Sequence, residues 1–290
     1  MEPFLEQRPW EVQHIDPSRR FASLGVSPPR SELRAAIWEI ATGELVWGPK
    51  GAEAICWSHS GSEVFVAGEI RPYYQGFLRR YSWPGLELTA DGGVEMAGYA
   101  FHGLAASSKG MVAVSSIDQT ETYVYLYDSD EAAGWPKLTA KWEDRGSNLI
   151  NGLEFSPDGS RLVWTLGAPY YWWTGGDEPR LSKGGRFEIG KIFAWKMDRR
   201  VPGEVMRANV VVSVPAGWSA DDPEDILSSQ MLQGPFFDSE GNFRMLLPTG
   251  DWKAYTPELR DLPDPEGGRK AVVREFATLN LRRASKADRS

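Results

Sequence analysis

Short apolar runs flank glycine-containing polar turns along the whole chain. The clearest example is Ser156–Ser160, which lies between the apolar runs Leu153–Phe155 and Arg161–Trp164. Its Asp158 and Gly159 tolerate the positive φ of a tight hairpin, and each flanking run has the length of a strand. The pattern predicts two paired antiparallel strands.

Related turns recur at 58–62, 107–110 and 238–242, and a fainter one lies at 16–20. Gly61, Gly110 and Gly159 follow one another at intervals of 49 residues, and Gly241 comes 82 residues later. A repeat of about 40–50 residues with several strands in each unit is typical of a propeller blade. The sequence therefore predicts an all-β fold, a β-propeller with five blades of four antiparallel strands.

We expect a single propeller domain over residues 1–290, because the repeats run nearly from end to end. The blades are predicted at about 9–50, 51–92, 93–144, 145–222 and 223–286. The last blade is expected to end in a third strand at Ala271–Leu279, which leaves its fourth strand missing. Residues 3–7 precede the first blade and are the candidate for a closing strand that covers this open edge.

Two segments resemble a known family of repeats. The unit at 153–164, and Ile37–Leu45 as a third strand with its turn, look like repeats of WD40 and TolB-type propellers. The resemblance implies a propeller at the level of the family. No Trp-Asp dipeptide ends a third strand and no Gly-His pair opens a blade, so the hydrogen-bonded tetrad of typical WD40 blades is not expected.

Composition narrows the classes of partner and site. The chain has 40 acidic and 32 basic residues, a net charge of −8, and its basic residues concentrate only at 282–289, which argues against nucleic-acid binding. Cys56 is the one cysteine and lies in an apolar run, so we expect a buried thiol and no disulfide. No metal or cofactor is expected. Without an apolar run of membrane-spanning length or a leader pattern at residues 1–8, we expect no membrane association and a cytoplasmic location.

The loops between second and third strands lie on one face of the predicted disc, and the longest are at 68–76, 167–190 and 249–270. Two of them share a Pro-Tyr-Tyr motif. Exposed aromatic side chains on a rigid scaffold anchor protein partners. The expected binding residues are Tyr73, Tyr74, Tyr170, Tyr171, Trp172, Trp173, Trp252 and Tyr255.

We therefore expect a non-enzymatic protein-interaction scaffold, with another protein as partner and no catalytic residue assigned. In one alternative the aromatic loops fold inward and close the central channel. Another is a carbohydrate-binding or glycoside-hydrolase-type propeller, which needs paired carboxylates near the axis. His14 and His102 fall near inner strands and Glu154 lies on another, which leaves a central acid–base pair open, whereas Asp16 and Asp238 are better explained by turn chemistry. The last is an acidic inhibitor or immunity-type partner protein.

Overall fold

The structure is a computed structural model, and it describes residues 10–26, 34–70, 75–94, 100–117, 121–129, 135–145, 148–169, 186–198, 201–213, 233–238, 240–246 and 252–262. These residues form strands and turns, and none of them lies in a helix. Accordingly, no helix in these ranges is long and apolar enough to cross a membrane.

Five four-stranded antiparallel sheets follow one another along the chain, each built from four consecutive strands. The first contains β1 (Trp10–Ile15), β2 (Phe21–Val26), β3 (Ala35–Glu39) and β4 (Glu44–Trp47). The second contains β5 (Ala52–Trp57), β6 (Glu63–Ile70), β7 (Gln75–Ser82) and β8 (Leu88–Val94). The third contains β9 (Ala100–Ala106), β10 (Met111–Ile117), β11 (Glu121–Asp128) and β12 (Lys137–Arg145). The fourth contains β13 (Asn148–Phe155), β14 (Arg161–Pro169), β15 (Arg186–Asp198) and β16 (Val201–Ser213). The fifth contains β17 (Gln233–Phe237), β18 (Phe243–Leu246), β19 (Trp252–Tyr255) and β20 (Asp261–Leu262).

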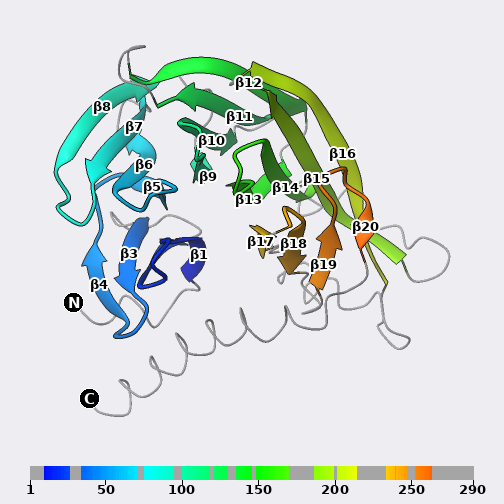
Figure 1. Ribbon diagram of the computed structural model, residues 1–290, viewed down its shortest axis with the longest axis horizontal. Helices are drawn as coiled ribbons and strands as arrows, with labels where there is room; N and C mark the ends of the chain where they lie inside the picture. Colours follow the sequence, from blue (N-terminus) through cyan, green and yellow to red (C-terminus); the bar gives the residue numbers. More distant parts are fainter. Residues whose placement is uncertain are drawn as a thin grey trace.

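The sheets are arranged as in a propeller. In each sheet the first strand lies nearest the common centre and the fourth lies at the rim (Figure 1). The turns between first and second strands lie at one end of the sheets, which we call the turn face. The connections between second and third strands lie at the other end, the loop face. The predicted all-β propeller of five four-stranded units is confirmed. β8 and β12 end at Val94 and Arg145, two residues and one residue beyond the predicted ends of their blades.

The fifth sheet corrects one prediction. Its third and fourth strands are β19 and β20, so Ala271–Leu279, which lies outside the described residues, is not the third strand. The sheet already has four strands, and this removes the reason for expecting residues 3–7 to supply a missing one. Those residues also lie outside the described ranges, so the closing strand stays a prediction.

One backbone position with positive φ lies in each of the five turns that join a first strand to a second strand. It is held by Arg19 in the first sheet, and in the others by Gly61, Gly110, Gly159 and Gly241. In every case its N–H donates to the carbonyl three residues earlier. Asp158 caps its turn as expected, because Oδ1 accepts hydrogen bonds from the Ser156 hydroxyl and from the N–H and hydroxyl of Ser160. These bonds lower the pKa of Asp158 to about 2.

The hydrophobic core lies mainly between neighbouring sheets. Apolar side chains of one sheet meet those of the next in four separate clusters, between the first and second, second and third, third and fourth, and fourth and fifth sheets. The largest groups are aromatic. Trp164 is fully buried and stacks on Phe193 with ring centroids 5.3 Å apart, and Trp142 meets both rings at 4.9 Å. This packing fixes the positions of the inner strands.

The inner strands carry bulges, where one extra residue interrupts the pairing with the second strand. Glu53, His102 and Asn151 are the extra residues in β5, β9 and β13, each five residues before the first residue of its turn. In β1 the extra residue is Gln13. A bulge redirects side chains along a strand, and here it lies close to the centre of the molecule.

Candidate functional site

The centre of the propeller holds a histidine and a glutamate in contact near the turn face. His14 of β1 and Glu154 of β13 each lie two residues before their turn, so they occupy the same register position in the first and fourth sheets. His14 Nε2 is 3.4 Å from Glu154 Oε2. The other oxygen of Glu154 accepts the Phe155 N–H at 3.2 Å. The structure therefore brings together the acid–base pair that the sequence left open.

Burial and charge act in opposite directions on His14. Burial lowers its pKa, but the Glu154 carboxylate, through its charge and its hydrogen bond, and then the charge of Asp16, raise it. The net effect raises the pKa of His14 above its ordinary value of 6.5. The histidine is consequently an imidazolium over a wider pH range than a free one.

Cys56 occupies the same register position in the second sheet and is fully buried. Burial, with the nearby Glu154 charge, raises the pKa of the thiol well above its usual range. A nucleophilic cysteine needs the opposite shift. The expectation of a buried structural thiol is confirmed.

Gln13 joins the first two sheets. Its amide nitrogen donates to the Glu53 carbonyl at 2.7 Å, and its amide oxygen accepts the Ile55 N–H at 3.2 Å. The bulge turns the Gln13 side chain toward β5. There its amide makes the pair of hydrogen bonds that the backbone of a neighbouring strand would make. Gly25 of β2 leaves the room that the amide fills, since a Cβ there would collide with Gln13.

A buried ionic network lies toward the loop face. Arg34, just before β3, pairs with Glu53 and lies 4.0 Å from Glu69. The second oxygen of Glu53 accepts the Phe101 N–H at 2.8 Å. The three charged side chains are only 11%, 5% and 5% exposed. The network thus connects the first three sheets, and its burial indicates a structural role.

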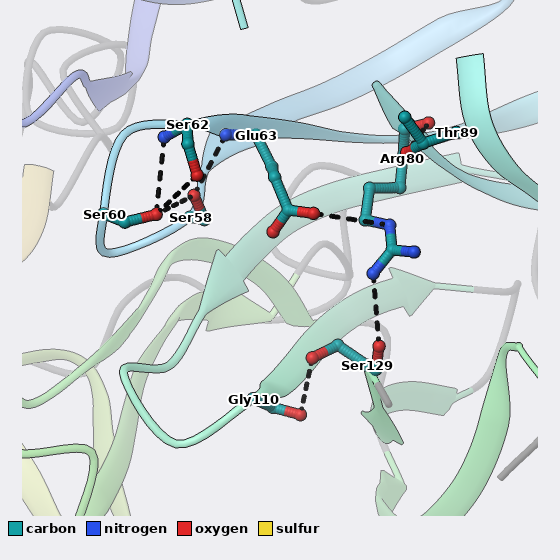
Figure 2. A network of polar contacts seen from close by, with 8 residues as sticks. All are labelled: Ser58, Ser60, Ser62, Glu63, Arg80, Thr89, Gly110 and Ser129. Carbon is teal, nitrogen blue, oxygen red and sulfur yellow. Dashed lines mark hydrogen bonds and ion pairs between the residues drawn. The ribbon is translucent and has the colours of Figure 1, made fainter. Parts of the chain in front are cut away.

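A second polar network connects the second and third sheets on the turn face. Arg80 of β7 donates to the Ser129 carbonyl at 3.4 Å and lies 3.6 Å from Glu63 (Figure 2). Its guanidinium also lies over the Trp135 ring. Ser129 in turn donates to the Gly110 carbonyl. Hydroxyls of Ser58, Ser60 and Ser62 bond one another and hold the neighbouring turn in shape.

The structure describes only part of the predicted aromatic surface. Tyr73, Tyr74, Tyr170, Tyr171, Trp172 and Trp173 lie outside the described residues. Trp252 is the first residue of β19, and its backbone alone is described.

Tyr255 corrects the prediction that placed it on the exposed surface. It is 1% exposed and stacks on Phe243 with ring centroids 5.6 Å apart. The predicted loop 249–270 contains β19, and this strand carries Tyr255 to the end that pairs with Phe243, beside the turn face. Tyr255 is therefore a core residue.

The turn carboxylates behave as expected. Asp16 accepts hydrogen bonds from the backbone of Ser18 and Phe21, and Asp238 from the backbone of Glu240 and Asn242. Over the described ranges, no group of three or more histidine, cysteine, aspartate or glutamate side chains is arranged to hold a metal ion. The acid–base pair at the centre is an imidazole facing a carboxylate.

Sequence reasoning missed the Arg34, Glu53 and Glu69 network. Glu53 interrupts the apolar run Ala52–Trp57, and a charged residue inside such a run is a signal of a buried partner. Which residue pairs with Glu53 depends on how the first three sheets are arranged around the centre. No local pattern in the sequence encodes that arrangement.

No protein-family model and no curated protein matches this chain. Solved structures do resemble it. One is the hydrazine synthase of Kuenenia stuttgartiensis, with a TM-score of 0.56 and 11% identity over 84% of this chain and 64% of that one. Others are a Dos1 propeller and TolB from Acinetobacter baumannii, both with a TM-score of 0.49, at 12% and 13% identity over 89% and 88% of this chain.

This chain spans about 64%, 60% and 53% of the lengths of those three structures. At sequence identities this low, the similarity bears on the fold alone. A shared fold does not establish a shared activity. The five four-stranded sheets agree with the propeller that the resemblance of the repeats to WD40 and TolB-type units implied. The chain is a β-propeller.

Proposed function

We propose that the chain is a non-enzymatic scaffold that binds another protein through the aromatic loops of its loop face. A propeller of interlocked sheets is a rigid support, and binding residues on such supports concentrate in the loops. The proposed contacts are Tyr73, Tyr74, Tyr170, Tyr171, Trp172 and Trp173, with Trp252 at their edge. Tyr255 is not among them. A cytoplasmic location is part of the proposal.

The observation that carries the proposal is the position of the ends of four strands. β6 ends at Ile70 and β7 begins at Gln75, and these two residues pair. β14 ends at Pro169 and β15 begins at Arg186, with Gly167 opposite Gly190. Both Pro-Tyr-Tyr motifs therefore belong to connections that leave the sheets at the loop face, at the opposite ends of β6 and β14 from their glycine turns.

The test is a variant with four substitutions, Tyr73→Ala, Tyr170→Ala, Trp172→Ala and Trp173→Ala. It is compared with a control variant that truncates exposed apolar side chains away from the loop face. The control is Leu45→Ala, Leu88→Ala and Leu138→Ala, which removes exposed apolar side chains from the rim strands β4, β8 and β12. A partner recovered from the native host with the wild-type protein is purified, and its Kd is measured for all three proteins.

We expect the loop variant to weaken binding at least tenfold, since aromatic anchors dominate interface energies at about 2 kcal/mol or more each. The control is expected to keep its affinity, with both variants retaining the wild-type circular dichroism. Equal affinity of the loop variant and the wild type contradicts the proposal.

The carbohydrate alternative makes a different prediction for the same loop variant. Aromatic rings also stack on sugars, so a glycan array probed with the wild-type protein separates the two possibilities. Glycan binding that the loop variant loses, together with no captured protein partner, favours the carbohydrate reading.

A further inference from the structure

The contact between His14 and Glu154 joins sheets that share no strand ladder. Among the described strands, hydrogen-bonded pairing stays within each sheet, and two other sheets separate the first from the fourth in chain order. We propose that this ion pair is a pH-sensitive bridge, which holds the first sheet against the fourth across the centre of the propeller while His14 is protonated.

The location of the pair suits a bridge of this kind. The side chains are 14% and 27% exposed, so water screens their attraction only in part, while protons still reach them. His14 also lies beside Trp57 of β5, with ring centroids 6.0 Å apart, which limits the positions of the imidazole. Glu154 is held on its other side by the Phe155 N–H.

Among the described residues, the charged groups that act on His14 are carboxylates. Glu154 faces it from β13, and Asp16 acts from its own hairpin. The Cys56 thiol of β5 lies within reach of the Glu154 charge and stays neutral near pH 7, because its pKa is raised. The neighbourhood therefore favours the imidazolium.

The sign of the pH dependence follows from the raised pKa of His14. A histidine whose folded-state pKa exceeds its unfolded value of 6.5 stabilises the fold fully below pH 6.5. That contribution is lost as the pH rises through the folded-state pKa. The bridge is therefore complete below pH 6.5 and is released as the pH rises above the folded-state pKa of His14.

The first experiment measures histidine pKa values by NMR on the full-length protein. The chain has only three histidines, and His59→Gln and His102→Gln assign the His14 signal by elimination. We expect His14 to titrate above 6.5 in the wild-type protein and at least one pH unit lower in Glu154→Gln, because burial then acts without the carboxylate. A wild-type pKa at or below 6.5 overturns the proposal without any variant at position 14.

The second experiment is a double-mutant cycle of His14→Gln and Glu154→Gln, followed by urea unfolding at pH 6 and pH 9. We expect a coupling that changes the unfolding equilibrium about threefold or more at pH 6 and is absent at pH 9. His59→Gln, at an exposed turn position, is the matched control and should change stability equally at both values. A coupling of equal size at both values means that the contact is merely structural. Neither measurement involves a partner, so its failure is distinct from failure of the proposed function.

Discussion

At the scale of the residue, the turn-closing glycines differ in what surrounds them. Gly159 and Gly241 both have positive φ, of 63° and 78°. A Cβ on Gly159 would lie 2.6 Å from the Ser107 hydroxyl and 2.9 Å from that of Ser108, whereas one on Gly241 would meet nothing within 4 Å. Both hydroxyls are engaged, because Ser107 accepts the Lys109 N–H and Ser108 donates to the Pro157 carbonyl.

Replacing each glycine by alanine separates backbone strain from steric crowding. We expect Gly241→Ala to cost about 1 kcal/mol of unfolding free energy, since it adds strain alone. Gly159→Ala should cost about 2–3 kcal/mol, because its Cβ also displaces the Ser107 hydroxyl and the Ser108 hydroxyl, the second of which joins the third sheet to the fourth. Urea unfolding of the two variants measures the difference, and equal costs would show that the contact between the two turns contributes nothing.

At the scale of the element, the sequence locates strands wherever an apolar run meets a glycine turn. Sheets two to four follow this pattern closely, and their turns close at Gly61, Gly110 and Gly159. The fifth sheet departs from it, because β19 and β20 are four and two residues long and are joined by a turn in which Leu259 has a φ of 60°. Leucine is not a residue that indicates a turn in the sequence. The positions of β19 and β20 therefore depend on tertiary packing and could not be predicted from the local pattern.

The ion pairs of the first sheet give a second test. Arg34→Met leaves Glu53 and Glu69 buried without the guanidinium, and such a loss costs about 3–5 kcal/mol. Arg20→Met is the matched control, since Arg20 also pairs with a glutamate, Glu39 at 3.0 Å, but is 68% exposed. We expect that change to cost less than about 1 kcal/mol. Unfolding free energies in urea distinguish the two, and similar small losses would mean that water reaches the network.

At the scale of the whole molecule, the arrangement of the sheets around the centre decides the site. The sequence placed His14 and Glu154 on inner strands, but their contact requires the first and fourth sheets to face each other. Tyr255 was mispredicted for the same reason. Its aromatic side chain indicated binding, but its pairing with Phe243 in the fifth sheet places it in the core. Sequence patterns identify the candidate residues of a site. The distances between those residues follow only from the arrangement of the five sheets around the centre.

The net charge of −8 bears on how a partner would associate. If aromatic loops supply the binding energy, raising the salt concentration from 50 to 500 mM should change Kd by less than about tenfold. An acidic inhibitor that masks a basic surface would instead lose affinity steeply. Titration calorimetry with the purified partner at both concentrations decides between these two kinds of binding.

The bulges at Glu53, His102 and Asn151 stand at one fixed distance before their turns. Because side chains alternate between the two faces of a strand, losing the extra residue would invert every side chain on one side of it. The length of this segment is therefore under stricter constraint than its amino acids. Deleting one residue between the bulge and the turn would therefore move core side chains to the opposite face of the strand, whereas a substitution there changes one side chain only.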